Sequence, residues 1–381
     1  MSRLASAKSN LLATATRRPW PVLVLRVSGP HNGPDCLSGL SSEDIREISC
    51  DRPDQLGELA RIERPIAALV HYGRRITNAG HQATLALAEA APAKINLALH
   101  VTGRRDDGYH LLESLAVFTR LGDRIEARPA PADGLALVGP FAAGLETDAG
   151  NLVVRAREAL RQAYASDADV PGLPRNAVHE AVSLRLSKHL PVAAGVGGGS
   201  SDAAATLKLL NRLWRLGLAP QRLAEVGGAL GADVPMCLAA RPLVARGIGE
   251  AIEPVADFPP LAIVLVNPGQ AVATPAVFSG LAAKRNPPLP PLPRAPGFSA
   301  LGGWLAATRN DLEGPATALA PGIADALAAL RASGAAFARM SGSGATCFGL
   351  FGTVAAAKAA AARIAQAEPG WFAAATQSMG S

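Results

Sequence analysis

The sequence predicts an α+β protein built from two layered domains, and three observations lead to that prediction. The chain has 381 residues, which is enough for two ordinary domains with a sizeable core. Apolar residues make up 49% and charged residues 18%, a balance typical of globular proteins. Segments with the two-residue period of strands and segments with the period of helices alternate irregularly along most of the chain, without an internal repeat.

Residues 1–88 differ in character from the rest, and we expect them to form a separate, irregular N-terminal extension. Residues 27–54 are rich in Gly, Pro, Ser, Asp and Cys and show little periodicity, which indicates irregular or disordered structure. The alternative is that this segment is an artefact of a gene model that starts too early. The natural start would then lie at Leu85 or Leu87.

Composition and charge disfavour several classes of protein. The formal net charge of +6 suits phosphate-rich ligands, but Arg is spread along the chain without a dense basic block, which disfavours nucleic acid as a partner. No run of 18 apolar residues occurs, so no membrane span is expected.

The four cysteines have no zinc-ligand or disulfide spacing, which favours reduced thiols in a cytoplasmic protein. A transit peptide over residues 1–18 is the alternative for localisation. The oligomeric state stays open.

From residue 90 the periodicity becomes regular. Residues 95–101 predict a strand that carries Lys94 and Asn96 on the face opposite its aliphatic side chains. Residues 282–303 are Pro-rich and predict a connector, with a PxxP ligand as the alternative. The other predicted strands cover residues 111–118, 123–128, 181–186, 261–266, 336–340 and 347–351. The predicted helices cover residues 55–62, 82–89, 151–165, 202–215, 221–230, 323–331 and 354–367.

The strongest chemical signal is the run LPVAAGVGGGSSDAA at residues 190–204, in which four glycines precede two serines and a predicted helix. Glycine lets several backbone N–H groups point into one concavity, and the helix adds its N-terminal donors and the positive end of its dipole. The run therefore predicts a phosphate cradle. It matches neither GxxxxGK[ST] nor GxGxxG, and the alternative is a flexible linker.

This run resembles the central ATP-binding motif of the galactokinase, homoserine kinase, mevalonate kinase and phosphomevalonate kinase (GHMP) superfamily. Three flanking pieces are similar to the 4-diphosphocytidyl-2-C-methyl-D-erythritol kinases, in the order of that family. They are PAKINL at 92–97 with DGYH at 107–110, LGADVP at 230–235, and RMSGSGA at 339–345. The resemblance implies the two-domain GHMP kinase fold. A ribosomal-protein-S5-like, ATP-binding domain would cover residues 89–250 and a ferredoxin-like domain residues 251–381.

The resemblance also implies an ATP-dependent kinase that uses Mg²⁺ and phosphorylates the 2-hydroxyl of the cytidyl sugar alcohol. Asp233 would be the general base, and Lys94 would steady charge at the reacting oxygen. Taken alone, Asp233 also suits an N-cap position before Pro235, and Lys94 suits a solvated strand position.

Further residues are implied in binding. The turn of Gly342, Ser343 and Gly344 would approach the reacting phosphate, with a tight strand turn as the alternative. Asn151 would face the adenine. The other ATP-binding residues implied are Pro191, Val192, Ala193, Ala194, Gly195, Val196, Gly197, Gly198, Gly199, Ser200 and Ser201.

The resemblance implies a pocket for the cytidyl substrate. Tyr109 and His110 would meet the cytosine, and Asn96 would hold the diphosphate or methylerythritol end. Thr274 and Phe278 would form the opposite wall, so that Tyr109 and Phe278 sandwich the base. The alternatives are a core position for Phe278 and a hydrogen-bonded surface position for His110.

The chain departs from the family where Ala193 and Ala194 replace glycines that often open the loop. Asp202, in the first turn of the predicted helix, either favours the helix dipole or helps to hold Mg²⁺. Two rival functions remain at this stage. One is another GHMP kinase, acting on homoserine or mevalonate, which would give the DGYH motif no base to stack on. The other is a non-catalytic nucleotide- or nucleic-acid-binding protein.

Overall fold

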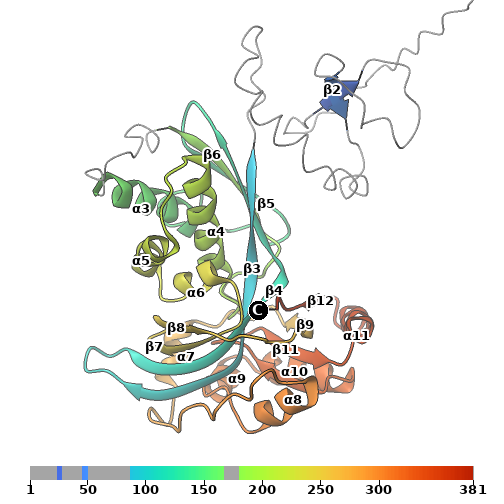
Figure 1. Ribbon diagram of the computed structural model, residues 1–381. Coiled ribbons are helices and arrows are strands. Elements are labelled where there is room, and N and C mark those ends of the chain that lie inside the picture. Colours follow the sequence, from blue (N-terminus) through green and yellow to red (C-terminus); the bar gives the residue numbers. More distant parts are fainter. Residues whose placement is uncertain (1–23, 28–44, 50–85, 167–179, 381) are drawn as a thin grey trace, which may run out of the picture. The chain divides into compact units, whose positions relative to one another are not determined.

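The computed structural model describes residues 24–27, 45–49, 86–166 and 180–380 (Figure 1). The chain divides into two compact units, Met1–Thr84 and Leu85–Ser381. In the first unit, β1 (Val24–Val27) and β2 (Ile45–Ser49) pair in antiparallel fashion. The expectation of irregular structure is therefore wrong for β2. The helix predicted over residues 55–62 lies outside the described residues.

The second unit is organised around a long hairpin of β3 (Leu87–Arg104) and β4 (His110–Pro129), which pair along their whole length (Figure 1). The helix predicted over 82–89 is wrong where it is described, because β3 already begins at Leu87. β4 runs unbroken through the two strands predicted at 111–118 and 123–128. The hairpin continues through Gly122 because that residue packs against the backbone of Ala91, where a Cβ atom would lie 2.3 Å from the carbonyl oxygen.

The free edge of β4 carries the rest of a six-stranded sheet. Its first half pairs with β7 and its second half with β6. β8 extends the sheet beyond β7, and β5 pairs in parallel beside β6. The bounds of these strands are β5 (Gly134–Val138), β6 (Val182–Ser187), β7 (Leu243–Gly247) and β8 (Ala251–Pro254).

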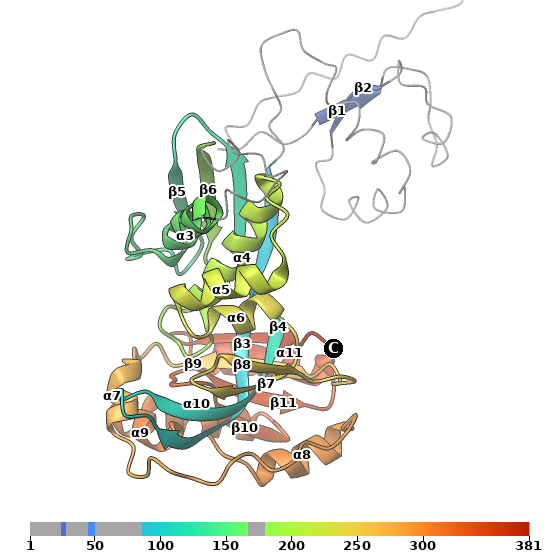
Figure 2. The ribbon, with the colours of Figure 1, turned by 60° about the vertical axis from the view of Figure 1, so that its left-hand side comes forward.

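Four helices pack against this sheet and enclose a core of mostly aliphatic side chains, with Phe118, Tyr164 and Trp214 among them (Figure 2). They are α3 (Leu152–Ser166), α4 (Gly198–Leu213), α5 (Pro220–Leu230) and α6 (Val234–Ala239). The predicted helices over 151–165 and 221–230 are confirmed within one residue at each end. α4 begins at Gly198, four residues before the predicted start, so two of the loop glycines and both serines belong to its first turn.

A second sheet has the strand order β10-β11-β9-β12 and is antiparallel throughout. Its strands are β9 (Ala262–Asn267), β10 (Phe337–Met340), β11 (Cys347–Phe351) and β12 (Phe372–Gln377). The remaining helices are α7 (Thr274–Ser279), α8 (Phe298–Ala306), α9 (Glu313–Leu319), α10 (Gly322–Ala332) and α11 (Val354–Ala367). Of these elements, the sequence analysis missed β12, α7, α8 and α9 and predicted β9, β10, β11, α10 and α11 to within one residue at each end. In the first sheet it missed β5, β7 and β8.

The two sheets share a core. Ile95 and Leu97 of β3 pack with Ile263 of β9, Phe348 of β11 and side chains of α8. This places Lys94 and Asn96 on the other face of β3, as the alternation predicted. The boundary predicted at residue 250 falls between two paired strands, β7 and β8, and the change of sheet comes after Pro254. No helix of the described part of the chain is long and apolar enough to cross a membrane.

Candidate active site

A cavity of about 1310 Å³ opens between the β3–β4 hairpin, the glycine loop, α6, α7 and the turn that follows β10. Sites for single small ligands commonly enclose about 300–1,000 Å³, so this cavity has room for two. Lys94, Asp233 and the glycine loop all line it, together with His110 and Phe278. Residues predicted to act in catalysis, in ATP binding and in substrate binding thus meet at one place.

Lys94 and Asp233 form an ion pair in this cavity, with 2.7 Å between the ammonium nitrogen and one carboxylate oxygen. The Lys94 side chain is 6% exposed, which excludes a solvated strand lysine, and the Asp233 side chain is 40% exposed. Asp233 does occupy the N-cap position of α6, but its side chain makes no capping hydrogen bond. The solvated position considered for Lys94 is therefore wrong, whereas the N-cap position considered for Asp233 is confirmed and leaves its carboxylate without a capping hydrogen bond.

The glycine loop and the turn after β10 touch through their backbones. Gly195 has φ +72°, and a Cβ atom there would lie 2.5 Å from the carbonyl oxygen of Ser341. Gly342 has φ +55°, and a Cβ atom there would lie 2.7 Å from the carbonyl oxygen of Gly195. Only glycine suits both conditions. The amide of Thr346 also donates to the carbonyl of Ala194, so the two turns form one floor for the cavity.

No side chain caps α4 at Gly197, so the first backbone donors of the helix have no capping partner. Gly197, Gly198, Gly199 and Ser200 line the cavity. The assignment of Val196 and Ser201 as ATP-binding needs correction. Val196 is buried in the core between the sheets. The buried Ser201 hydroxyl donates to the carbonyl of Pro92, so it is turned away from any phosphate.

The start of the loop, Pro191 to Ala194, lines the cavity, but Asn151 is already engaged elsewhere. Its amide donates to the carbonyl of Glu146, and its oxygen accepts from the amide of Val153 at the start of α3. Asn151 reaches the cavity wall as a helix cap, and its polar atoms are used within the fold. An adenine contact through its side chain would need these hydrogen bonds to be exchanged.

The turn after β10 is held by hydroxyl groups. Ser341 is buried; its hydroxyl accepts from the amide of Asn96 and donates to the carbonyl of Gly195. Ser343 and Thr274 share a hydrogen bond of 2.7 Å between their hydroxyl oxygens. Gly342, Ser343 and Thr274 line the cavity, whereas Gly344 lies behind them against Met340.

The aromatic wall differs from the predicted sandwich. Phe278 stacks on His110, with 4.9 Å between ring centroids and 24° between ring planes. Tyr109 lines the same cavity but is 62% exposed. Burial lowers the pKa of His110, with the positive charges of Arg104 and Lys284 acting in the same direction, so the ring is held neutral. Its Nε2 atom has no hydrogen-bond partner in the fold.

Asn96 lines the cavity and its side-chain amide donates to the hydroxyl of Ser114 at 2.7 Å. That hydroxyl in turn donates to the carbonyl of Ala98. Asn96 is thereby fixed on β3, two residues from Lys94. The acceptor oxygen of its amide remains available to the cavity.

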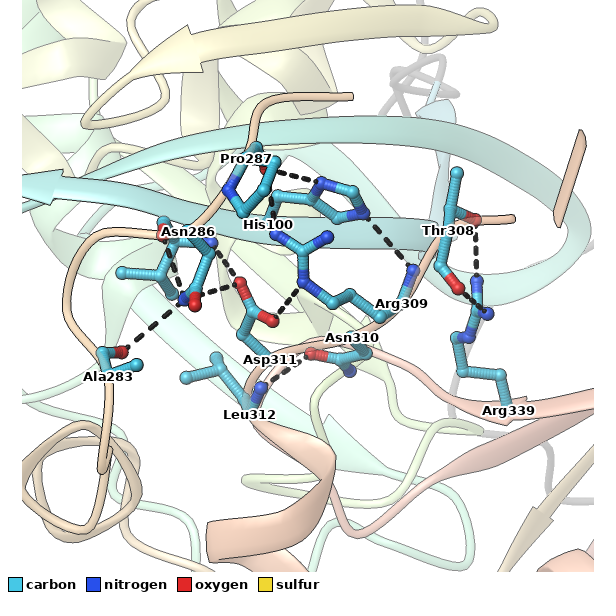
Figure 3. Close-up of polar contacts among 11 residues, drawn as sticks. His100, Ala283, Asn286, Pro287, Thr308, Arg309, Asn310, Asp311, Leu312 and Arg339 are labelled. Carbon is cyan, nitrogen blue, oxygen red and sulfur yellow. Dashed lines mark hydrogen bonds and ion pairs between the residues drawn. The ribbon is translucent and has the colours of Figure 1, made fainter. Parts of the chain in front are cut away.

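The sequence analysis missed a polar segment that braces the site, residues 308–311 (Figure 3). Asn310 donates to the carbonyls of Met340 and Gly342, on either side of Ser341, and accepts from the amide of Leu312. Asp311 accepts from the amide of Val101 on β3. Four consecutive polar residues between two apolar stretches, TRND at 308–311, are the signal that could have drawn attention to this segment.

Two further residues shown in Figure 3 complete this brace. The amide of Arg309 donates to Nε2 of His100, so the proton of this ring lies on Nδ1 and points at the carbonyl of Pro287. Arg339 is buried and donates to the carbonyls of Leu97 and Thr308. Burial lowers the pKa of Arg339 to about 10, so the group keeps its charge at neutral pH.

Comparison with known proteins agrees with the geometry. The chain matches the family models "GHMP kinases N terminal domain" over residues 151–241 and "GHMP kinases C terminal" over residues 295–369. It is 56% identical over 291 residues to a protein of Mesorhizobium japonicum named 4-diphosphocytidyl-2-C-methyl-D-erythritol kinase, covering 76% of this chain and 95% of that one. A protein of the same name from Paracoccus denitrificans is 54% identical over 290 residues, with 76% and 95% covered.

Solved structures show the same relationship. A crystal structure of 4-(cytidine 5'-diphospho)-2C-methyl-D-erythritol kinase superposes with a TM-score of 0.60 at 35% identity, covering 77% of this chain and all of that one. A homoserine kinase from Cytophaga hutchinsonii superposes with a TM-score of 0.53 at 16% identity, covering 80% and 97%, and shares the fold alone. With its motifs gathered in one cavity and relatives of this identity, the chain belongs to the 4-diphosphocytidyl-2-C-methyl-D-erythritol kinase family of GHMP kinases.

Proposed function

We propose that the chain transfers the γ-phosphoryl group of ATP to the 2-hydroxyl of 4-diphosphocytidyl-2-C-methyl-D-erythritol, a step in non-mevalonate isoprenoid precursor synthesis. The observation that carries this proposal is the pair of Lys94 and Asp233, 2.7 Å apart, facing the same cavity as the glycine loop. The names of the relatives at 54–56% identity support the choice of substrate.

In the proposed reaction, the Asp233 carboxylate takes the proton of the acceptor hydroxyl as its oxygen attacks the γ-phosphorus. The bond between that phosphorus and the β,γ-bridging oxygen breaks, and ADP leaves. The Lys94 ammonium group lies beside the carboxylate and offsets negative charge that develops at the attacking oxygen. Phosphoryl transfer needs mainly positioning and charge stabilisation, which this pair and the backbone donors supply.

ATP would place its phosphates against the first turn of α4, where Gly198, Gly199 and Ser200 line the cavity. Mg²⁺ supplies charge neutralisation on the phosphates when it is bound. Within the described residues, no group of three His, Cys, Asp or Glu side chains could hold a metal ion. Mg²⁺ would therefore take most of its ligands from phosphate and water, as it commonly does. One oxygen of Asp202 is already paired with the ammonium of Lys188 at 2.7 Å, so at most its second oxygen could serve as a ligand.

The cytidyl end would occupy the aromatic wall. The neutral His110 ring, with its unpartnered Nε2, suits a hydrogen bond to a base, and Phe278 supports that ring from behind. We propose that the exposed Tyr109 closes over the base from the other side and that Asn96 contacts the diphosphate or methylerythritol end. Thr274 and Ser343 would complete the wall nearest the reacting centre.

We propose the cytoplasm as the compartment, since ATP is available there and the buried thiols of Cys237 and Cys347 stay reduced. The partner is a small molecule; nucleic acid and membranes have no role in this proposal. The two kinase domains would divide after Pro254, where the chain changes sheets, and one family model matches on each side of that point. Residues 1–88 stand outside the match. Mass spectrometry of the native N-terminus would show whether this segment is present in the cell.

The test is ADP release by the purified chain with ATP and Mg²⁺, offered the cytidyl substrate, mevalonate or homoserine in parallel. We expect turnover with the cytidyl substrate alone and loss of turnover in Asp233→Asn. Asp325→Asn, at an exposed position on α10, is the matched control and keeps full activity. Phosphorus NMR of the product locates the new phosphate on the 2-oxygen.

Two results would contradict the proposal. Turnover of mevalonate or homoserine instead would leave the chemistry in place and make the assignment of the pocket wrong. A folded chain that binds ATP, turns over no alcohol and binds RNA or DNA with strong salt dependence would favour the non-catalytic alternative.

A further inference from the structure

Beneath the glycine loop lies a buried group of three charged side chains that the proposed chemistry does not use. Lys188, directly after β6, places its ammonium nitrogen 2.6 Å from a carboxylate oxygen of Asp123 on β4 and 2.7 Å from one of Asp202 on α4. All three residues are at most 3% exposed. We call them the Lys188 cluster.

The Lys188 cluster contacts both ends of the glycine loop. At the front end, the other oxygen of Asp123 accepts hydrogen bonds from the amides of His189 and Leu190, the two residues before Pro191. At the rear end, Asp202 belongs to the first turns of α4. A Cβ atom on Gly198 would lie 3.1 Å from the ammonium nitrogen, so that nitrogen sits directly under the first residue of the helix. Lys188 therefore links the segment that precedes the glycine loop, through Asp123, to the helix that follows it, through Asp202.

The charges of the cluster are not balanced, since two carboxylates share one ammonium group. Burial alone would lower the pKa of Lys188, but Asp202 and Asp123 outweigh it and raise that pKa, so the lysine is charged. Burial raises the pKa of Asp202 to about 7, against the pull of Lys188 and with the nearby Asp123 adding to the rise. The second oxygen of Asp202 has no hydrogen-bond partner. A buried arrangement of this kind is weak as a source of stability, so its role is better sought in geometry.

We propose that Lys188 is a positioning residue for ATP, which fixes the glycine loop and the first turn of α4 relative to β4 so that their backbone donors stand ready for the nucleotide phosphates. This inference rests on the proposed function of the cavity. Preorganised donors avoid a reorganisation cost when a charged ligand arrives, and a loop held at both ends keeps them in place.

The same geometry predicts for which substrate the binding affinity falls when Lys188 is removed. Among the hydrogen bonds and ion pairs of the described residues, the cluster shares none with Lys94, Asp233 or Asn96. The side of the cavity that would hold the acceptor alcohol is instead braced by Asn310, which donates to the turn after β10 and not to the glycine loop. Removal of Lys188 should therefore weaken nucleotide binding and leave binding of the alcohol close to normal.

The experiment compares Lys188→Met, Lys188→Arg and Lys208→Met. Lys208 is a partly buried lysine on the same helix, α4, that does not line the cavity, which makes it a matched control. Calorimetry with a non-hydrolysable ATP analogue and Mg²⁺ measures nucleotide affinity without the alcohol, and steady-state rates give KM for each substrate. Thermal unfolding reports stability in parallel.

For Lys188→Met we expect analogue affinity to fall and KM for ATP to rise by about tenfold or more, with KM for the alcohol changed by less than about twofold. Lys188→Arg should recover part of the loss, and Lys208→Met should change neither value. If Lys188→Met does not fold, the double variant Lys188→Met with Asp202→Asn removes one charge of each sign and keeps Asp123 on its two amides. The same loss of analogue affinity is expected from it.

Unchanged analogue affinity in either folded variant would overturn the inference, and so would an equal rise of both KM values. Asp202→Asn that raises the Mg²⁺ requirement without changing KM for ATP would also overturn it, by making Asp202 a metal ligand. The test is separable from that of the proposed function. If the wild-type chain phosphorylated none of the alcohols yet bound the analogue in a Lys188-dependent way, the proposed reaction would fail and the positioning role would stand.

Discussion

The ammonium nitrogen of Lys94 lies 2.7 Å from a carboxylate oxygen of Asp233, and the two residues reach each other from separate elements, β3 and the start of α6. The lysine is buried and the carboxylate half-exposed, so the strand holds the cation beneath a carboxylate that faces the cavity. The pair thus combines a proton acceptor with a fixed positive charge at one point of the cavity wall.

The first prediction concerns the cation of this pair. Lys94→Met should lower kcat by about 10²–10³-fold, the range observed when one charge-stabilising group is removed from an active site. KM for ATP should change much less, because the glycine loop is held by other contacts. Steady-state kinetics at saturating substrate measures the effect. A variant with wild-type kcat would show that Lys94 only supports the strand.

The second prediction concerns Asn310, which holds the turn at Gly342. Asn310→Asp keeps the acceptor for the amide of Leu312 but removes the donors to the carbonyls of Met340 and Gly342. Stability should fall by about 1–3 kcal/mol, the cost of leaving buried polar groups unpaired. Urea unfolding measures this cost, and kcat should fall with it because the turn loses its support.

Asn211→Asp is the control for that variant. Asn211 also donates and accepts through its amide, both to Leu218, and it does not line the cavity. It should lose stability without a change in kcat of the remaining folded protein. Equal losses of kcat in the two variants would mean that Asn310 acts on stability alone.

The third prediction is a pH dependence of stability from His100. Burial lowers the pKa of His100 below 6.5, and Arg309 adds to the effect, while Asp311 opposes it. Below about pH 6.5, His100 is therefore protonated more readily in the unfolded chain than in the folded chain. The stabilising contribution is complete above about pH 6.5 and is lost as the pH falls below that value. His100→Asn should flatten the decline in unfolding free energy between pH 7 and pH 5; an unaltered slope would assign the decline to other groups, such as His110.

The fourth prediction has the opposite sign and comes from Asp202. Its pKa in the folded chain is raised to about 7 from 3.8. The folded chain thus binds more protons than the unfolded chain between these values, and its stability falls as the pH rises from about 4 to 7. Asp202→Asn removes this slope and should be at least as stable as the wild type at pH 8. Unfolding free energies at pH 5 and pH 8 check the prediction, and a loss of stability at pH 8 would contradict it.

The fifth prediction concerns the aromatic wall. Phe278→Leu removes the ring that stacks on His110. Aromatic pairs contribute about 0.5–1.5 kcal/mol beyond their buried area, so KM for the cytidyl substrate should rise by up to about tenfold. KM for ATP should not change. If both KM values rose together, Phe278 would serve the fold of the cavity as a whole, which is the core position that the sequence left open.

Local sequence was sufficient for most of the elements that carry the site. The alternation from Ile95 to Val101 gave the strand and the face on which Lys94 and Asn96 lie, because strand periodicity is fixed by backbone geometry. The run of glycines predicted a tight loop before a helix for a similar reason, since glycine adopts the positive φ of Gly195 and Gly197 without strain. Resemblance to a known family then supplied roles that no local pattern contains.

Tertiary structure alone decided which polar groups remain free for chemistry. Ser200 and Ser201 are neighbours in sequence, yet only Ser200 lines the cavity. The Ser201 hydroxyl donates a hydrogen bond to the carbonyl of Pro92, which lies more than a hundred positions away in the sequence. The ion pair of Lys94 and Asp233, the Lys188 cluster and the brace at Asn310 likewise join distant segments. The periodicity of a sequence predicts local secondary structure and the face on which a residue lies. The partner of a buried hydrogen bond or charge is chosen by the packing of separate elements, and so it appears only when they come together.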